Sequence, residues 1–352
     1  MAQGISEAIG IDLGDRWSHV HAIAAETGEV LGVRRVRTTV EELAKLFGGL
    51  APTRVVIETG THANWVARLA SRHGHAPLVA QARCLRVIYQ NPRKSDALDA
   101  QMLAELGSTH PHLLHPVQVR DEVTQADLAV LRARETLVEG RTRIVSSVRG
   151  MVKSLGHRLP TCDAAHFARR AREACPPALR PAVLPLLESV ETISAQIAEL
   201  DGRVVELATQ RYARQTRPLV AIPGVGVLTA LAFVLVVGDP RRFRRNRDVG
   251  AYLGLVPRRD QSGSSDPQLG ITRCGDRLVR RLLVQCAHVM LRTRGQDCDL
   301  RRWGLARAAR GGKASKKRAV VAVARRLAVM MLALLRSGAD YEPLRLASRR
   351  TA

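Results

Sequence analysis

Apolar and polar positions in the first third of the chain follow the periods of strands and helices in turn. Ala8–Gly14 is an apolar run, Ser18–Ala25 alternates apolar and polar residues, and Val30–Thr38 forms a third extended pattern, so three successive strands are predicted. The following segments predict, in order, a helix over Val40–Leu50, a strand over Arg54–Glu58, a helix over Ala63–His73, a strand over Pro77–Gln81 and a helix over Ser95–Gly107. The pattern therefore predicts an α/β domain.

The order of these elements narrows the fold class. Three antiparallel-type strands followed by helix, strand, helix, strand and helix are the order of an RNase H-like domain. In that topology the first strand, the fourth strand and a late helix converge at one end of the sheet. Functional side chains on those three elements would therefore be expected to meet.

The middle of the chain has a long helical period. Val130, Leu137 and Ile144 recur every seven residues within Val123–Gly156, and a second helical pattern covers Leu186–Arg211. Pro- and Ala-rich residues 160–185 lie between the two patterns and are interpreted as a connecting tip. Two long helices joined by a tip predict a coiled-coil hairpin, while an ordinary helical bundle fits the same spacing equally well.

The last region is predicted to be mainly helical. Gly224 and Gly226 form a Gly-x-Gly turn between two helical segments, which resembles the hairpin of a helix-hairpin-helix and would present backbone N–H groups to phosphate. Helices are predicted over Asp276–Arg292 and Ala319–Leu335. The fold class is thus α/β plus α, and we predict three domains, over residues 1–120, 121–215 and 216–345.

Charge changes the picture for the C-terminal region. The net charge of the 352 residues is +23, and residues 217–352 hold 28 Lys and Arg against 9 Asp and Glu, whereas residues 1–216 hold 27 against 23. This asymmetry indicates a polyanionic partner for the C-terminal third. A high-GC genome would explain the preference for Arg over Lys, but not its position. Aromatic residues make up only 3%, so base-stacking platforms are nearly absent.

One run of arginines is dense enough to suggest a phosphate-binding surface. Its members are Arg241, Arg242, Arg244, Arg245 and Arg247. Guanidinium groups bind phosphate through two parallel hydrogen bonds, so we predict that this run and the Gly224–Gly226 turn contact nucleic acid. The alternative is a solvated basic loop without a ligand.

Neither a membrane nor an oxidising compartment is indicated. The longest apolar runs, Leu231–Val237 and Leu327–Leu335, are too short to span a bilayer, and Met1–Gly10 lacks the features of a signal peptide. The six cysteines are scattered without a Cys-x-x-Cys pair, which is typical of free thiols in a reducing cytosol. We expect a cytoplasmic, nucleoid-associated protein with no membrane partner.

Four acidic residues are candidates for a metal site. Asp12 and Glu58 each lie near the end of an apolar strand, where a carboxylate is costly to bury unless it is paired or binds a cation. Asp96 and Asp99 lie one turn apart at the start of the helix that follows Pro92, where most such pairs are merely solvated. Together the four could hold two ions, and oxygen-only ligands favour Mg²⁺ or Mn²⁺.

An actin-like ATPase is a competing interpretation of the first strand. The first phosphate loop of that class also reads Ile-Gly-Ile-Asp-Leu-Gly, as residues 9–14 do here. However, we find no further Gly-rich phosphate or adenosine loop, and the chain lacks the two-domain size of that class. The ATPase is therefore the weaker interpretation.

Ser262 is a candidate nucleophile. It lies in the Gly- and Ser-rich segment 261–266, in a region rich in arginine. A serine hydroxyl attacks phosphate only when a base, a metal or a cationic neighbourhood stabilises the alkoxide. From composition alone, a plain linker is the better reading of this segment.

The ordered set of motifs resembles one family. Ile9–Gly14, Glu58–Gly60, Lys94–Ala100, Ile222–Ala230, Tyr252–Pro257 and Gln261–Gly263 occur in the order and rough spacing of the DEDD transposases of insertion sequences, the one-ten and eleven-eleven group. The resemblance extends from residue 9 to about residue 295. It implies an N-terminal RuvC-like nuclease domain, a coiled-coil linker and a C-terminal transposase domain.

The resemblance also implies site residues and partners. Asp12, Glu58, Asp96 and Asp99 match the four metal-binding acids of the family, and Ser262 matches its serine nucleophile, with Ser264 and Ser265 as close neighbours. Members of the family resemble one another in using a noncoding bridge RNA that pairs with target and donor DNA. Their active complexes are dimers that pair into a tetramer. We therefore expect an Mg²⁺-dependent, RNA-guided DNA recombinase that forms a covalent phosphoserine.

Two other functions fit part of the same pattern. A hydrolytic RuvC-like nuclease would use the four acids alone and would tolerate a change at Ser262. A non-enzymatic nucleic-acid-binding protein would use the Gly224–Gly226 turn and the arginines, and would tolerate changes at Asp12 and Asp99.

Overall fold

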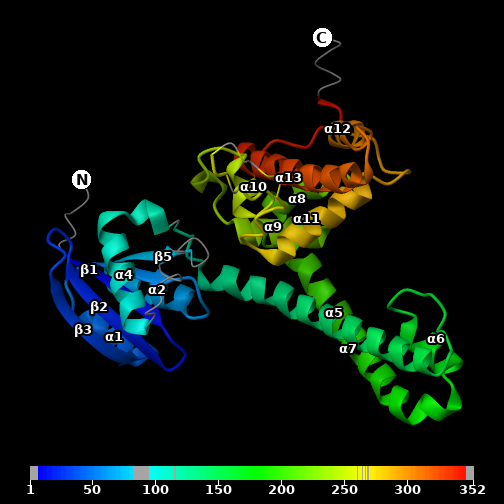
Figure 1. Ribbon diagram of the computed structural model, residues 1–352, viewed down its shortest axis with the longest axis horizontal. Helices are drawn as coiled ribbons and strands as arrows, with labels where there is room; N and C mark the ends of the chain where they lie inside the picture. The colour runs from blue at the N-terminus through cyan, green and yellow to red at the C-terminus, as the bar shows by residue number, and fades with distance from the viewer. Residues whose placement is uncertain are drawn as a thin grey trace. The chain divides into compact units, whose positions relative to one another are not determined.

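The computed structural model describes residues 7–81, 95–114, 116–259, 261–263, 265, 267 and 269–345. The chain forms two compact units, Met1–Gln125 and Ala126–Ala352, and each is described by itself (Figure 1). The first unit is an α/β domain and the second is helical.

The first unit contains a five-stranded mixed sheet in the order β3-β2-β1-β4-β5. Its strands are β1 (Glu7–Leu13), β2 (Trp17–Ala24), β3 (Val30–Arg37), β4 (Arg54–Glu58) and β5 (Ala76–Ala80). β1, β2 and β3 pair antiparallel, while β4 and β5 run parallel to β1. The central strand β1 therefore joins the antiparallel part of the sheet to its parallel part.

Helices cover the two faces of this sheet differently. The helices and the short 3-10 turn of the unit are α1 (Val40–Gly48), α2 (Ala63–Arg72), α4 (Asp96–Thr109) and η2 (Pro111–Leu114). Ile9 and Ile57 point from one face into a core that includes residues of α1 and α2. Val56 and Ala80, from alternate positions, pack on the other face with Leu103 of α4. Successive side chains along each strand point to opposite faces of the sheet, so the apolar residues form one core layer on each face.

Helix α4 lies directly on β1 because Gly10 has no side chain. A Cβ atom on Gly10 would lie 1.9 Å from the carbonyl oxygen of Ala100 and 2.5 Å from the backbone nitrogen of Ala104. Nearer the end of α4, a Cβ atom on Gly107 would lie 2.2 Å from a methyl carbon of Val56 on β4. The small residues of α4 therefore face the sheet, and backbone contact fixes the helix position.

The second unit contains a pair of long antiparallel helices. They are α5 (Glu122–Ser154) and α7 (Arg180–Thr209), with α6 (Phe167–Ala174) and η3 (Pro177–Leu179) between them. The Arg134 guanidinium binds Asp201 at 2.5 Å, and the Arg141 guanidinium donates to Ser194 at 3.1 Å, so residue numbers rise along one helix as they fall along the other. At the far end, Phe167 of α6 packs into the apolar core between the helices (Figure 1).

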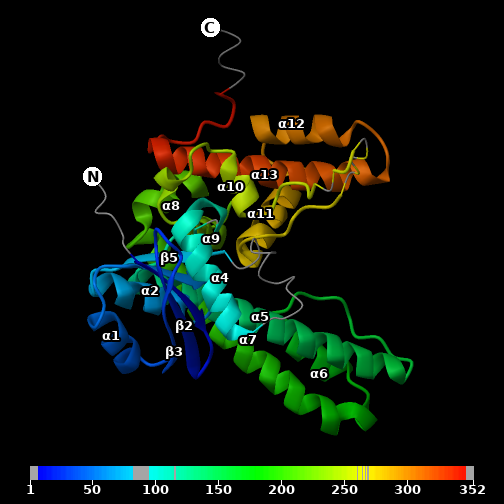
Figure 2. The same cartoon turned by 60° about the vertical axis from the view of Figure 1, so that its left-hand side comes forward.

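A bundle of shorter helices completes the second unit. Its elements are α8 (Ala213–Val220), α9 (Val227–Val237), η4 (Pro240–Arg242), α10 (Asp248–Tyr252), α11 (Arg277–Met290), α12 (Asp299–Ala308) and α13 (Lys313–Ser337). Every residue of α9 from Thr229 to Val237 is buried, as expected for a helix that is apolar all round. Helices α11 and α12 both pack against α13, which lies between them (Figure 2). No helix in the described ranges is both long and apolar enough to cross a bilayer.

The predicted elements of the first unit agree with the structure to within one or two residues at their ends. The α/β fold class of this region is confirmed, and its element order is consistent with an RNase H-like domain. Helices α6, α10 and α12 of the second unit were not predicted; α6 lies in the segment interpreted as a connecting tip. Helices α6 and α10 are short, with eight and five residues, and α12 buries only Leu300 and Gly304, so none of them gives a long apolar period. The division into three domains stays a prediction.

The contact between α4 and β1 can be tested at Gly10. Gly10→Ala is expected to lower the free energy of unfolding by about 3 kcal/mol, because the added Cβ meets backbone atoms that cannot rotate away. Urea unfolding followed by circular dichroism measures this change. The matched control is Gly32→Ala on β3, where an added Cβ meets nothing within 4 Å. Equal effects of the two substitutions would contradict the assignment.

Candidate functional site

Two predicted acids lie side by side at one end of the sheet. The parallel pairing of β1 and β4 matches Gly10 with Val56 and Ile11 with Ile57, so Asp12 and Glu58 are the next pair along. Residues paired in this way point from the same face, and neighbouring strands are about 4.8 Å apart. Both carboxylates are half-buried. Two like charges at this spacing favour a cation between them.

The direction of α4 brings a third acid to the same end. Ala100 lies on Gly10, whereas Gly107 accepts a hydrogen bond from Arg54 at the start of β4, so α4 runs antiparallel to β1. Its first turn therefore lies toward Asp12 and Glu58. Asp99, in that turn, is 6% exposed. The sheet and α4 together bring Asp12, Glu58 and Asp99 to one end of the unit.

Asp96 belongs to the same helical turn but is more exposed. Ser95 caps the helix by accepting a hydrogen bond from the Leu98 backbone at 3.3 Å, as expected from the sequence. Asp96 is the first residue of α4 and its side chain is exposed. Pro92 and Lys94, which precede this turn in the sequence, lie outside the described residues. Asp96 can thus reach an ion from the solvent side of the helix start.

The acidic side chains at this end of the sheet have the oxygen ligands that a hard divalent cation prefers. Carboxylate oxygens are the ligands that Mg²⁺ and Mn²⁺ prefer, and three or four of them are available here. Within the described ranges, no three His, Cys, Asp or Glu side chains are close enough to form a metal cage. The four-acid metal site therefore stays a prediction.

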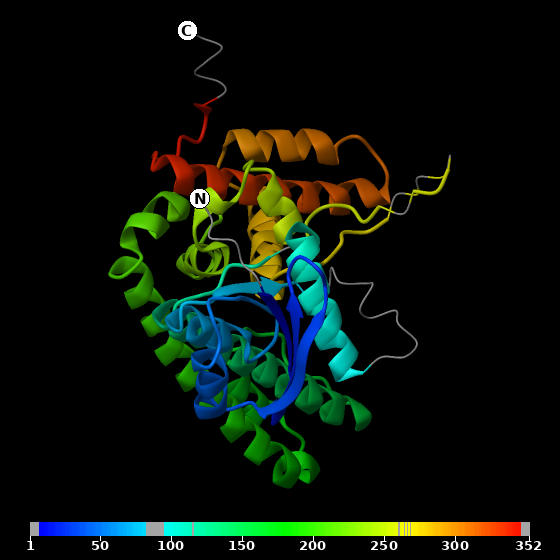
Figure 3. The same cartoon turned by 90° about the vertical axis from the view of Figure 1, so that its left-hand side faces the viewer.

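Ser262 lies in the second unit, at the tip of a long two-armed loop. Pro257 pairs with Ile271 at the start of the arms, and the Arg258 backbone donates to Gly270 at 2.8 Å. Figure 3 shows the two arms of this loop in yellow. At the tip, the backbones of Ser262 and Ser265 exchange hydrogen bonds of 3.1 and 3.0 Å. Ser262 is exposed, and its hydroxyl has no hydrogen-bond partner among the residues that the structure places. The loop therefore presents this hydroxyl to solvent.

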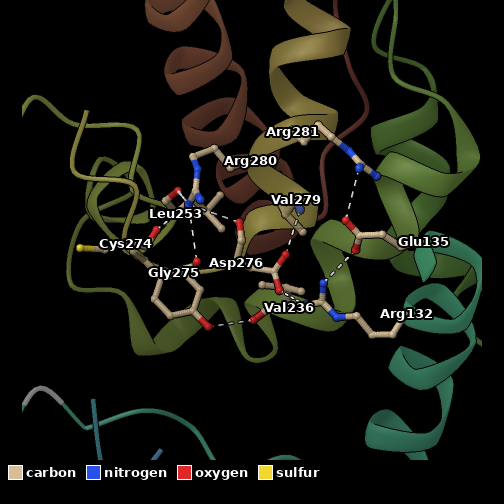
Figure 4. A network of polar contacts seen from close by, with 11 residues as sticks. Arg132, Glu135, Val236, Leu253, Cys274, Gly275, Asp276, Val279, Arg280 and Arg281 are labelled. Atoms are coloured by element: carbon tan, nitrogen blue, oxygen red, sulfur yellow. Dashed lines mark hydrogen bonds and ion pairs between the residues drawn. The ribbon is translucent and has the colours of Figure 1, made fainter. Parts of the chain in front are cut away.

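The base of the loop is held rigidly. Gly275 has a positive φ of 73°, and a Cβ there would lie 1.9 Å from the carbonyl oxygen of Tyr252. A Cβ on Gly254 would lie 2.2 Å from the carbonyl oxygen of Cys274. The Arg280 guanidinium donates to the carbonyl oxygens of Cys274 at 2.7 Å and Leu253 at 3.1 Å (Figure 4). A rigid base with an exposed tip limits the positions that the serine can reach.

Ion pairs connect this base to the long helix α5. Asp276 caps α11 by accepting from the Val279 backbone at 2.9 Å, and its other oxygen binds Arg132 of α5 (Figure 4). Glu135 of α5 binds both Arg132 at 3.2 Å and Arg281 at 3.4 Å. The Asp276 and Glu135 side chains are largely buried, so solvent screens these pairs only partly. The sequence did not predict the pairing of Arg132 with Asp276, because partners 144 residues apart leave no local pattern.

The predicted arginine run divides into two roles. The Arg242 guanidinium lies 4.3 Å from the ring centres of both Phe243 and Tyr252 and donates to the Val237 carbonyl, so it is part of the fold. Arg241 binds Asp239, and its hydrogen bonds lower the pKa of that carboxyl. The remaining members are exposed and have no ion pair within the described ranges; they are Arg244, Arg245 and Arg247. These three are the better candidates for phosphate contacts.

The Gly224–Gly226 turn joins α8 to α9, as predicted. Gly224 has a positive φ of 82°, and Gly226 is the residue before the first turn of α9. Both glycines are exposed. The two glycines therefore lie at the surface beside the positive end of the α9 helix dipole.

Comparison with known proteins shows that the chain is similar to transposases of insertion sequences. A model of the transposase IS116/IS110/IS902 family matches residues 216–300, and a transposase model of the DEDD IS110 type matches residues 9–156. Among similar proteins is the transposase for insertion sequence element IS1328 of Yersinia enterocolitica, 31% identical over 84% of this chain and 87% of the relative. The transposase for insertion sequence element IS1111A of Coxiella burnetii is 30% identical over 90% and 86%.

The two roles within the arginine run predict opposite effects of substitution. Arg242→Ala is expected to cost about 2 kcal/mol of stability, because it removes a half-buried cation stacked on two rings. Arg244→Ala should leave the melting temperature unchanged and weaken the binding of duplex DNA, with a shallower dependence on salt. Thermal unfolding and binding at several salt concentrations distinguish them. If Arg242→Ala unfolds like the wild type, its structural role is wrong.

Proposed function

The chain belongs to the IS110 family of insertion-sequence transposases, and from this membership we propose that it cuts and rejoins DNA strands through a phosphoserine at Ser262. The observation that carries the proposal is the pair of arrangements at the two predicted sites. Acids from β1, β4 and α4 lie toward one end of the sheet, and the predicted serine is exposed at the tip of a loop whose base is held by backbone contacts and by Arg280.

The serine step conserves the energy of the broken bond. The Ser262 Oγ attacks the scissile phosphorus and loses its proton, a bond from Oγ to phosphorus forms, and the bond to one sugar oxygen breaks. That oxygen takes up a proton and leaves as a hydroxyl. The reverse attack by a hydroxyl of another strand releases the serine, so joining needs no ATP.

The acids supply the electrostatic part of the reaction. Asp12, Glu58, Asp96 and Asp99 would hold Mg²⁺ or Mn²⁺, which when bound supplies positive charge against the phosphate oxygens. In this chain the carboxylates are held by adjacent strands and by a helix in backbone contact with one of them, so their separation changes little. The serine and the acids belong to different compact units, so catalysis requires a DNA strand that reaches both, in one subunit or in two.

We propose that a guide RNA, and not the protein, selects the DNA sequences that are cut and joined. In this proposal a noncoding bridge RNA pairs with target and donor DNA, and the protein works as dimers that pair into a tetramer. The protein then needs contacts to nucleic-acid backbone more than to base edges. The exposed residues Arg244, Arg245 and Arg247 support this, because they carry charge without an internal partner in the described ranges.

A hydrolytic nuclease is the rival activity. It is favoured by one observation: within the described ranges the Ser262 hydroxyl has no hydrogen-bond partner that could act as a base. In that case water would attack the phosphate, and no covalent adduct would form. The two activities therefore differ in the chemical state of the cleaved strand.

The serine can be tested by trapping the adduct. Wild-type protein mixed with its bridge RNA, its element-end DNA and Mg²⁺ is expected to give a covalent complex that survives denaturing electrophoresis. Ser262→Ala should abolish the complex, because the attacking oxygen is absent. Ser265→Ala, in the same loop tip, is the matched control and should retain it. An adduct in Ser262→Ala would show that another residue attacks.

The acids can be tested by metal-dependent strand cleavage. Asp12→Asn and Asp99→Asn are each expected to reduce the cleavage rate at least about a hundredfold, since each removes a negative charge from the predicted ion site. Asp15→Asn is the control, because Asp15 is near β1 but its side chain is 94% exposed. Cleavage that is unchanged in Asp99→Asn, or that needs no divalent ion, would contradict the metal site.

A further inference from the structure

Strand β2 and the edge strand β3 carry side chains on the same face of the sheet as the acids. Asp12 pairs with His19 across β1 and β2, His19 pairs with Arg35 across β2 and β3, and Trp17 pairs with Arg37. Paired residues point to one face, and so do residues two apart along a strand. Trp17, His19, Arg35 and Arg37 therefore share the face of Asp12 and Glu58.

Trp17 and the two arginines form one cluster. The indole is 40% exposed, and the guanidinium carbons of Arg35 and Arg37 lie 4.8 and 5.4 Å from its ring centre. A guanidinium stacked on an indole keeps its N–H groups directed sideways, where they can bind phosphate. The cluster thus combines an exposed aromatic surface with two oriented cations.

Hydrogen bonds hold this end of the sheet in place. The Thr38 hydroxyl donates to the Gly14 carbonyl at 2.9 Å and contacts the Ser18 hydroxyl at 2.8 Å. The Thr38 backbone N–H donates to Arg16 at 3.0 Å. The end of β3 is therefore tied to the turn between β1 and β2, and the cluster is arranged before any ligand binds.

The charge of the cluster is not balanced inside the molecule. Across the described ranges neither Arg35 nor Arg37 forms an ion pair, whereas Arg172 binds Glu191 and Arg302 binds Asp297. Trp303 offers a comparison: it also lies under two guanidinium groups, but it packs against the bundle core. Trp17 thus has two arginines over its ring, as Trp303 does, but Trp17 is exposed to solvent.

We propose that the cluster of Trp17, Arg35 and Arg37 binds a single-stranded polynucleotide beside the acidic site. The proposal rests on the proposed function, because it gives the substrate of that site a place to bind. An unpaired base stacks on the indole, and the guanidinium groups bind the flanking phosphates. A duplex keeps its bases stacked on one another and cannot use the indole in this way.

The position of the cluster fits this role. Trp17 is on the strand next to Asp12 and two residues beyond the position paired with it, so their Cα atoms are roughly 8 Å apart on the lattice of a sheet. A strand held at Trp17 therefore passes the carboxylates. A second copy of the chain is a poorer occupant, because Arg34, Arg35 and Arg37 on β3 would face the same charges on the other copy.

Binding of oligonucleotides to the full-length protein tests the proposal. The probes are a fluorescein-labelled thymidine oligonucleotide and a uridine oligonucleotide of equal length, followed by anisotropy without Mg²⁺. Trp17→Ala should weaken binding about tenfold, the effect of one stacked base. Arg35→Gln with Arg37→Gln should reduce the salt slope by about 1.4, that of two phosphate contacts. A preference for one probe identifies DNA or RNA as the strand that binds here.

The matched control is Arg34→Gln, which removes the same charge from the same strand. Arg34 pairs with Val20, so its side chain points to the opposite face of the sheet, and it should bind like the wild type. Trp17→Phe gives a second readout: quenching of tryptophan fluorescence by the oligonucleotide should be lost even if the fold is fully retained. Equal binding by all four variants and unchanged quenching would overturn the proposal, as would a β3-dependent dimer that excludes the oligonucleotide.

The binding test of the Trp17 cluster and the adduct test of Ser262 can fail independently of each other. If the wild type forms no phosphoserine but Trp17→Ala still weakens oligonucleotide binding, the strand-binding surface holds and the serine mechanism fails. If the adduct forms normally and Trp17→Ala binds like Arg34→Gln, the serine mechanism holds and the strand-binding surface fails.

Discussion

The backbone contact between α4 and β1 at Gly10 is the constraint on which the acidic site depends. With no Cβ at that position, the helix lies close enough for the Ala100 carbonyl to occupy the space of a side chain. This contact sets the height of α4 over the sheet, and the direction of α4 puts its first turn at the end where β1 and β4 finish. Asp99 is thereby brought toward Asp12 and Glu58. Strand pairing thus places Asp12 and Glu58, and a residue with no side chain determines how close Asp99 comes to them.

The loop that carries Ser262 differs from the acidic site, because only its base is fixed by packing. Its base is fixed by glycines that allow backbone contact and by Arg280, which donates to the carbonyls of Leu253 and Cys274, while Ser262 at the tip is exposed. Ion pairs through Asp276 and Glu135 extend this fixed base to α5. A nucleophile that must reach a phosphate on a separate molecule benefits from such an arrangement, because few orientations have to be lost when DNA binds. In the proposed mechanism the acids are preorganised by packing, and the serine by its anchored loop.

Local pattern in the sequence was sufficient for the sheet, for α4 and for the candidate acids. Asp12 and Glu58 could be found because each ends an apolar strand, and Ser95 because a cap has a fixed place before a helix. Arg280 and Asp276 could not, because their partners are carbonyl groups or residues of a distant helix. Arg242 was assigned to the nucleic-acid surface by the charge of its neighbours, although its stacking on Phe243 and Tyr252 depends on tertiary structure. The same limit applies to Trp17: a low aromatic content indicated few stacking platforms, and only strand register shows that this indole and two arginines share a face with the acids.

The central claim is that Ser262 becomes covalently bound to DNA in a reaction supported by the four acids. Its most direct test is mass spectrometry of the trapped complex after nuclease digestion, on the peptide that follows Arg259 and ends at Arg273. The account predicts a residual nucleotide linked through phosphate to Ser262, present with Mg²⁺ and absent in Asp99→Asn. A nucleotide on Ser264 or Ser265, or cleaved DNA with an unmodified peptide, would contradict it.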